Sequence, residues 1–197
     1  ESVSSISKSV QVLSCTDLEI EETDSVFSLD AGSEFTGVSD PAASLTSLAQ
    51  STSGMLGNQE AVYALQEVTT DAQLVPTRGT DWGDNGVWRS LHNHSWTATH
   101  RDVNNTWDQL NQKVYQASEI IDSRSNASAE IVAQAKFYRA FNMYLVMDMY
   151  GQVPFRNVGD GPDVIPSVLS RTEAYDFVEQ DLIESLQALP DLSAGDT

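Results

Sequence analysis

One stretch, residues 129–150, constrains the fold of this chain more than any other part of the sequence. Apolar residues recur along it at helical spacing, in the order Ile131, Ala135, Tyr138, Phe141, Leu145 and Met149. From Phe137 onward the stretch is apolar on more than one face, which is typical of a helix packed between neighbours. Gly151 then ends the helix and Pro154 prevents it from resuming.

Two further apolar stripes predict helices. Residues 103–121 repeat apolar side chains at spacings of four and three, in the order Val103, Trp107, Leu110, Val114, Ala117 and Ile121. A last helix begins near Ser170 or Thr172, where Glu173 is placed to reinforce its first turn. Its predicted inner face is the stripe Tyr175, Val178, Leu182, Leu186 and Leu189, and Pro190 closes it.

The start of a first helix is predicted at Asp40 and Pro41, because aspartate caps a helix N-terminus and proline fits the first helical position. Gly54 and Gly57 mark its end, and residues 151–169 are predicted to be a turn-rich crossing. No segment shows the alternation of a strand over a useful length. The predicted class is all-α, with stacked antiparallel helical hairpins that are tetratricopeptide-like and joined by long ordered loops.

The net charge of −19, from 29 acidic and 10 basic residues, limits the possible partners. Such a surface repels phosphate backbones, so nucleic acid is excluded as a partner. It also repels anionic lipid headgroups, so we expect contact with a membrane only through a lipid anchor. There is no run of about 18 apolar residues that would span a bilayer as a helix. Neutral ligands, cations and basic protein surfaces remain compatible with the charge.

The first 30 residues are rich in Ser, Thr, Asp and Glu and are predicted to be a flexible tether, ahead of a helical domain at 31–197. The single cysteine, Cys15, allows no intramolecular disulfide. The preceding residues 12–14, Val-Leu-Ser, match those before a lipoprotein cysteine, whereas the polar residues 1–9 depart from the usual leader. Cys15 is therefore a candidate for lipidation, with an unmodified thiol as the alternative.

Residues 69–100 form a long non-periodic segment that holds three of the four tryptophans. Because disordered linkers are poor in aromatic residues, we expect this segment to be ordered. An indole ring can stack on the apolar face of a sugar while neighbouring polar groups bind its hydroxyls. The candidate ligand-binding residues are therefore Asp71, Arg78, Asp81, Trp82, Asn85 and Trp88. The alternative, which we favour for Trp96 and Trp107, is that a tryptophan only pins the chain to the core.

Metal sites have weaker support. His92 and His94, with His100 nearby, lack the convergent spacing of a zinc site, so structural roles are favoured. Calcium is possible at Asp81, Asp84 and Asn85, but these residues miss the spacing of an EF-hand and equally suit a turn. We assign no metal and no cofactor.

Catalysis has little support either. No phosphate loop, nucleophile elbow or zinc-protease helix is present. A glycosidase needs a pair of carboxylates, but among so many acidic residues such a pair arises easily by chance. We expect a binding protein and not an enzyme.

Four blocks, in order along the chain, resemble the SusD/RagB family. The strongest is 135–155, AKFYRAFNMYLVMDMYGQVPF, which is similar to the family's Ala-x-x-x-Arg-Ala-Phe helix ending in Tyr/Phe-Gly-x-Val-Pro. The second, within 67–88, contains EVTTD, VPTRGTDW and GVW. The third, within 91–107, contains LHNHSW and VNNTW, and the fourth is 170–190. Together they are spread over residues 67–190, which is most of the range 16–192.

The resemblance implies an all-helical lipoprotein on the outer membrane of a Bacteroidetes-like cell, lying as a lid on a TonB-dependent SusC-like transporter. It implies capture of oligosaccharides, or of peptides in some members, with no bond broken. The acidic residues after Cys15 resemble the surface-export signal of such lipoproteins. Further helix pairs and a loop-rich region are expected after Thr197, and without them the outer face of the last helix would be exposed. A tetratricopeptide-like protein-interaction scaffold, or a peptide-binding member of the family, is the alternative.

Overall fold

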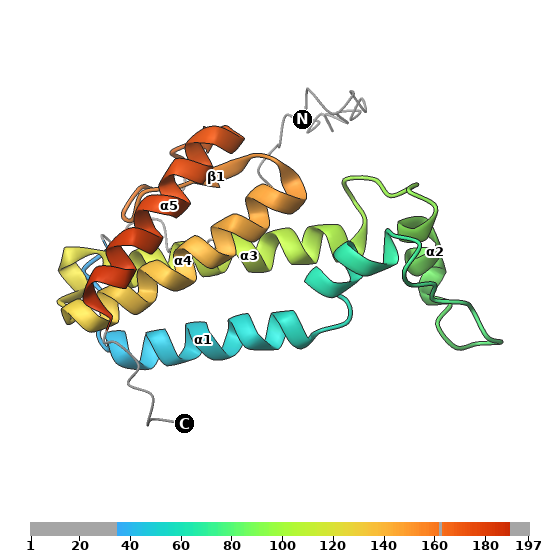
Figure 1. Ribbon diagram of the computed structural model, residues 1–197, viewed down its shortest axis with the longest axis horizontal. Coiled ribbons are helices and arrows are strands. Elements are labelled where there is room, and N and C mark those ends of the chain that lie inside the picture. The colour runs from blue at the N-terminus through green and yellow to red at the C-terminus, as the bar shows by residue number, and fades with distance from the viewer. Residues whose placement is uncertain (1–34, 162, 190–197) are drawn as a thin grey trace, which may run out of the picture.

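The computed structural model describes residues 35–161 and 163–189 and shows an all-α architecture (Figure 1). Its body consists of the long helices α1 (Pro41–Gly57), α3 (Arg101–Ile121), α4 (Ala129–Tyr150) and α5 (Arg171–Ala188). α4 lies between α3 and α5, α1 packs against α3 and α4, and successive long helices run in opposite directions. The predicted fold class is confirmed. The tetratricopeptide-like pairing stays a prediction, and the tether at 1–30 with Cys15 lies outside the described residues.

The ends of the long helices follow from local signals that the sequence shows. At the start of α1, the Asp40 carboxylate accepts a hydrogen bond from the Ala43 N–H at 3.0 Å. At the start of α5, Ser170 and Glu173 form a capping box in which each side chain bonds the other residue's backbone N–H. α4 ends at Gly151, whose φ of 82° lies in the left-handed region that glycine adopts without steric cost.

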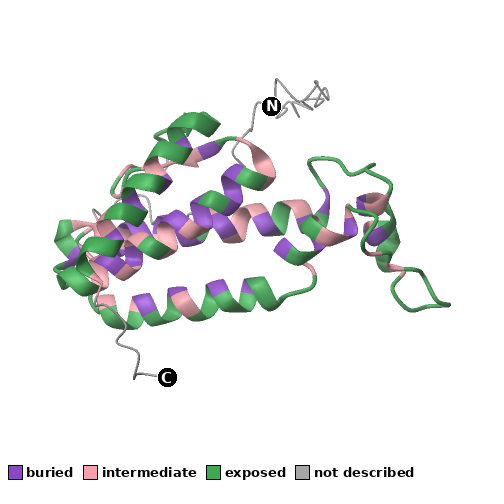
Figure 2. Ribbon diagram, in the orientation of Figure 1, coloured by how far each residue is buried: buried purple, intermediate pink, exposed green. Residues whose placement is uncertain are grey.

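The main core lies between α3, α4 and α5, and Figure 2 shows buried residues concentrated along α3 and α4. A buried ion pair crosses from α4 to α5. Arg139 donates from Nε and Nη2 to the two carboxylate oxygens of Asp181 at 2.7 and 2.8 Å, and the two side chains are 12% and 6% exposed. The Arg139 guanidinium also lies 4.9 Å from the ring centroid of Phe177. α5 is therefore held by charge as well as by apolar packing.

The predicted inner face of α5 is largely wrong. Of that stripe only Val178 is buried, while Tyr175, Leu182 and Leu186 are exposed. The helix instead turns inward the residues Ala174, Val178, Asp181 and Ser185. The pattern of apolar residues does not reveal this face, because two of the four residues on the face, Asp181 and Ser185, are polar. Asp181 lies on the buried face because it pairs with Arg139.

The segment that we predicted to be a turn-rich crossing, residues 151–169, contains two short strands. Strands β1 (Val153–Phe155) and β2 (Ser167–Leu169) pair antiparallel, with Val153 opposite Leu169. Each has three residues, which is too short for alternation to be recognised. The strands bring the chain from α4 back to the start of α5 (Figure 1).

The segment that precedes α3 contains short helices. A π-helical turn, η1 (Ala64–Val68), is followed by the 3₁₀ turn η2 (Asp84–Gly86) and by α2 (Val87–His92), which lie beyond the ends of α1 and α3 (Figure 1). α2 was not predicted, because six residues give too few turns for a helical period. No helix in the described part of the chain is long and apolar enough to cross a membrane.

Candidate ligand-binding site

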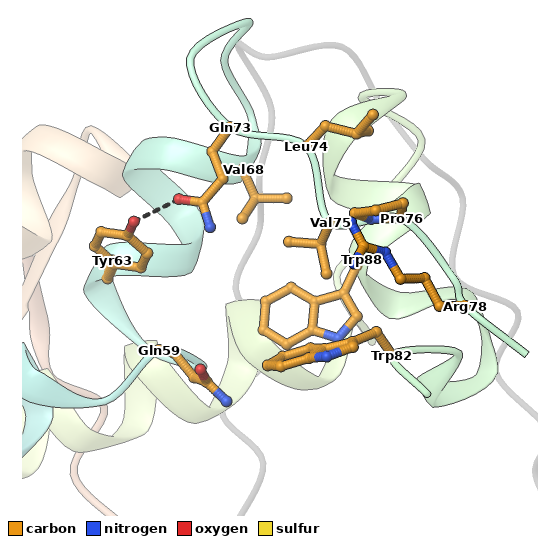
Figure 3. A pocket seen from close by; sticks show the side chains of 10 residues that line it. All are labelled: Gln59, Tyr63, Val68, Gln73, Leu74, Val75, Pro76, Arg78, Trp82 and Trp88. Atoms are coloured by element: carbon orange, nitrogen blue, oxygen red, sulfur yellow. Dashed lines mark hydrogen bonds between the residues drawn. The ribbon is translucent and has the colours of Figure 1, made fainter. Parts of the chain in front are cut away.

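A cavity of about 270 Å³ lies beside the tryptophan segment, between the stretch that follows α1 and the loop that leads to α2 (Figure 3). Its wall combines aromatic and aliphatic side chains with two amides, a phenol and a guanidinium. The ten lining residues are Gln59, Tyr63, Val68, Gln73, Leu74, Val75, Pro76, Arg78, Trp82 and Trp88. An apolar wall with a few polar groups is the usual composition of a small-molecule site.

Trp88 anchors the wall of the cavity. It is buried in a small core with Ala64, Val68 and Leu91, and its indole N–H donates to the Asp84 carboxylate at 2.6 Å. Trp82 packs against it edge to face, with ring centroids 5.8 Å apart and planes inclined by 61°. Trp82 itself is 44% exposed. The buried indole therefore fixes the position of the exposed one.

The backbone around Trp82 is held in an unusual conformation. Arg78 and Asp81 exchange backbone hydrogen bonds at 3.0 Å in both directions, which closes a tight turn. Directly after it, Trp82, Asp84 and Asn85 have φ values of 56°, 35° and 54°. Left-handed backbone costs a non-glycine residue about 1–2 kcal/mol, and such strain tends to gather at functional sites. The packing of Trp82 on Trp88 and the bond from Trp88 to Asp84 offset this cost.

Polar groups line the opposite side. The Tyr63 hydroxyl donates to the Gln73 side-chain oxygen at 2.5 Å, which joins two stretches of chain on this side of the cavity (Figure 3). Gln59 lies nearby, and Arg78 extends back toward Pro76 and the two indole rings. Donors and acceptors therefore face an exposed aromatic ring, which is the arrangement that suits a ligand with both apolar faces and hydroxyls.

Of the six predicted site residues, Arg78, Trp82 and Trp88 line the cavity. Asp71, Asp81 and Asn85 do not line it: Asp71 is exposed in a turn, while Asp81 and Asn85 shape the backbone on either side of Trp82. The binding roles of all six stay predictions.

Sequence reasoning missed Gln59, Tyr63 and Gln73. Tyr63 follows Gln59 by four residues, a spacing that places both on one side of a helical turn. This spacing alone does not predict a binding site, because Gln59 and Tyr63 come to line a cavity only when the tryptophan segment packs against this stretch.

Two of the three histidines, His94 and His100, make structural contacts. His100 caps α3, since its Nδ1 accepts from the Asp102 N–H at 3.2 Å, and its Nε2 lies 3.2 Å from the Val87 carbonyl oxygen. His94 Nε2 lies 2.6 Å from the Thr69 carbonyl oxygen. Within residues 35–161 and 163–189, no group of three or more His, Cys, Asp or Glu side chains could hold a metal ion.

The two remaining tryptophans differ from each other. Trp107 packs against Tyr150 with ring centroids 4.9 Å apart, as expected for a core residue. Burial raises the pKa of Tyr150 well above its usual value, and its hydroxyl donates to the Val103 carbonyl at 2.8 Å. Trp96, which we expected to pin the segment to the core, is 41% exposed and contacts His94. Trp96 lies outside the cavity, and since His94 is also exposed, the prediction that Trp96 pins the segment to the core is wrong.

Comparison with known proteins gives one match. A family model for SusD-like proteins, described as starch-binding and associating with the outer membrane, matches residues 30–196. No curated protein and no solved structure matches the chain.

Proposed function

Because the chain belongs to the SusD-like family of starch-binding proteins associated with the outer membrane, we propose that it captures an oligosaccharide in the cavity beside Trp82. The proteins of this family bind glycans and are not typically enzymes. We place glycan binding at the cell surface and assign it to Arg78, Trp82 and Trp88, which the sequence predicts and which line the cavity, together with the amides that the geometry adds.

One observation carries the proposal: an exposed indole, packed on a buried one, lines a cavity that also presents amides and a guanidinium. Trp82 is fixed by Trp88, so stacking on a sugar ring requires little further ordering of the protein. Gln59, Gln73 and Arg78 then supply the polar groups that sugar hydroxyls need.

We further propose that the bound glycan passes to a SusC-like TonB-dependent transporter, on which the protein lies as a lid. Lipidation of Cys15 would hold it at the membrane, since a net charge of −19 gives no attraction to anionic lipid. Capture proceeds without hydrolysis. In support, none of the ten lining residues is Asp or Glu, whereas glycosidases generally cut with a pair of carboxylates.

The test is a glycan-array screen followed by calorimetric titration, with reducing-sugar release measured in the same samples. Covering about 60 Å² of indole at about 25 cal/mol per Å² contributes roughly 1.5 kcal/mol, so Trp82→Ala should weaken binding about tenfold. Trp96→Ala is the matched control, because Trp96 is exposed to a similar extent but lies outside the cavity. Equal losses in both variants would refute this location, and sugar release would move the protein among the enzymes.

A protein-interaction scaffold is the second candidate. The exposed apolar side chains of α5, among them Tyr175, Ile183 and Leu186 at 55%, 46% and 75% exposure, favour a protein contact on that helix. Capture of the transporter by a protein that binds no glycan on the array would support this function over the first.

A further inference from the structure

The distribution of basic residues is informative in a chain with only 10 of them against 29 acidic ones. Four of the basic side chains in the body of the fold are held by carboxylates. The ion pairs are Arg101 with Glu60 and Asp102, Arg124 with Asp122, Lys136 with Glu184, and Arg139 with Asp181. Among the described residues, Arg78, Arg89, Lys113 and Arg171 meet no carboxylate.

Arg78 is the one of these four that lines the cavity. Within the described residues its guanidinium makes no ion pair or hydrogen bond, although its backbone is fixed by the turn with Asp81. The nearby carboxylate of Asp84 already accepts a hydrogen bond from the Trp88 indole N–H. Figure 3 shows the Arg78 side chain reaching back over the indole rings and not outward from the cavity.

The rest of the wall supplies no compensating charge. Arg78 is the one basic residue among the ten that line the cavity, and the polar neighbours Gln59, Tyr63 and Gln73 are neutral. The hydroxyls of a neutral sugar can accept hydrogen bonds from the guanidinium but bring no counter-charge to it. An anionic group would instead form a charge-assisted, bidentate pair with it.

Resting on the glycan-binding function above, we infer that the cavity selects an acidic oligosaccharide whose carboxylate or sulfate group pairs with Arg78 while a sugar ring lies against Trp82. The cavity, at about 270 Å³, is at the small end for a ligand site, so the charged group and the stacked ring belong to the same or adjacent sugar residues. The anionic group is recognised inside a protein whose overall charge would otherwise repel it.

The experiment uses pairs of array glycans that differ only in charge: uronic-acid oligosaccharides with their carboxyl-reduced counterparts, and sulfated oligosaccharides with their desulfated ones. Affinities are measured for the full chain, for Arg78→Gln and for Arg89→Gln. Arg89→Gln makes the same change of charge at an exposed arginine of α2 that does not line the cavity. Thermal melts of both variants confirm that they fold.

We expect the acidic member of a pair to bind at least about tenfold more tightly than its neutral counterpart, because a hydrogen-bonded ion pair is lost with the charge. Arg78→Gln should abolish that difference and Arg89→Gln should keep it. The pair that responds identifies carboxylate or sulfate. Equal binding of charged and neutral partners, or undiminished discrimination by Arg78→Gln, overturns the inference but leaves glycan capture intact. Binding of no glycan at all overturns both.

Discussion

The buried pair between Arg139 and Asp181 provides the sharpest test of how the helices are held together. Arg139→Leu keeps an apolar side chain on α4 but removes the cation, and it leaves Asp181 only 6% exposed and without its partner. The contact of the guanidinium with Phe177 disappears as well. The substitution therefore isolates a charge in the interface between α4 and α5.

Because both side chains are largely buried, the free-energy cost of breaking a buried ion pair applies to this pair. Removing one partner of a buried pair costs about 3–5 kcal/mol. For a chain of this length each kcal/mol lowers Tm by about 2–4 °C, so Arg139→Leu should lower Tm by roughly 6–20 °C. Lys136→Met is the matched control, because its pair with Glu184 joins the same two helices but lies closer to solvent. Solvation and screening make that pair worth much less, so the control should shift Tm far less.

Thermal unfolding followed by circular dichroism at 222 nm measures both effects, and urea titration gives the free energies of unfolding. The double variant Arg139→Leu/Asp181→Leu should recover much of the loss, because it buries no unpaired charge. The reasoning is refuted if Arg139→Leu melts within about a degree of the control, or if the double variant is no more stable than the single one.

Four further predictions concern local features. Gly151→Ala should lower the free energy of unfolding by about 1–2 kcal/mol, because alanine is strained at φ 82°. Gly54→Ala, inside α1 with nothing within 4 Å of the added methyl, should raise it by about 0.5–1 kcal/mol in the same urea titrations. Ser170→Ala removes the cap of α5 and should cost about 1 kcal/mol, and an unchanged urea midpoint would contradict the capping box. The hydrogen bond from Arg124 lowers the pKa of Asp122 to about 2. The stability that this carboxylate contributes is therefore complete above about pH 4 and is lost as the pH falls toward 2. Asp122→Asn should flatten the profile of unfolding free energy against pH in that range.

Helix ends were predictable because the signals that set them are local. Asp40 before Pro41, Ser170 with Glu173, and Gly151 each act within one turn of chain, and the structure uses all of them. The resemblance of four separate blocks predicted the family, which the match over residues 30–196 confirms. Trp82 stood out by its residue type alone, and the structure places it at the cavity.

The features that sequence missed depend on contacts between distant segments. The inner face of α5 carries Asp181 and Ser185, and nothing local to that helix shows that Arg139 stands opposite. Likewise Tyr63 and Gln73 become cavity residues only because η1 and the tryptophan segment share a small core. Polar residues that are placed by tertiary structure give no periodic signal.

That small core has a consequence for the energetics of the molecule. Ala64, Val68, Trp88 and Leu91 form a cluster distinct from the main core of α3, α4 and α5, so the end of the protein that carries Trp82 can open without unfolding the helical body. Amide protons of α2 are therefore expected to exchange with deuterium faster than those in the middle of α4. A ligand held against Trp82 slows that exchange by a factor set by its concentration relative to Kd, so hydrogen exchange at α2 provides a direct measure of occupancy.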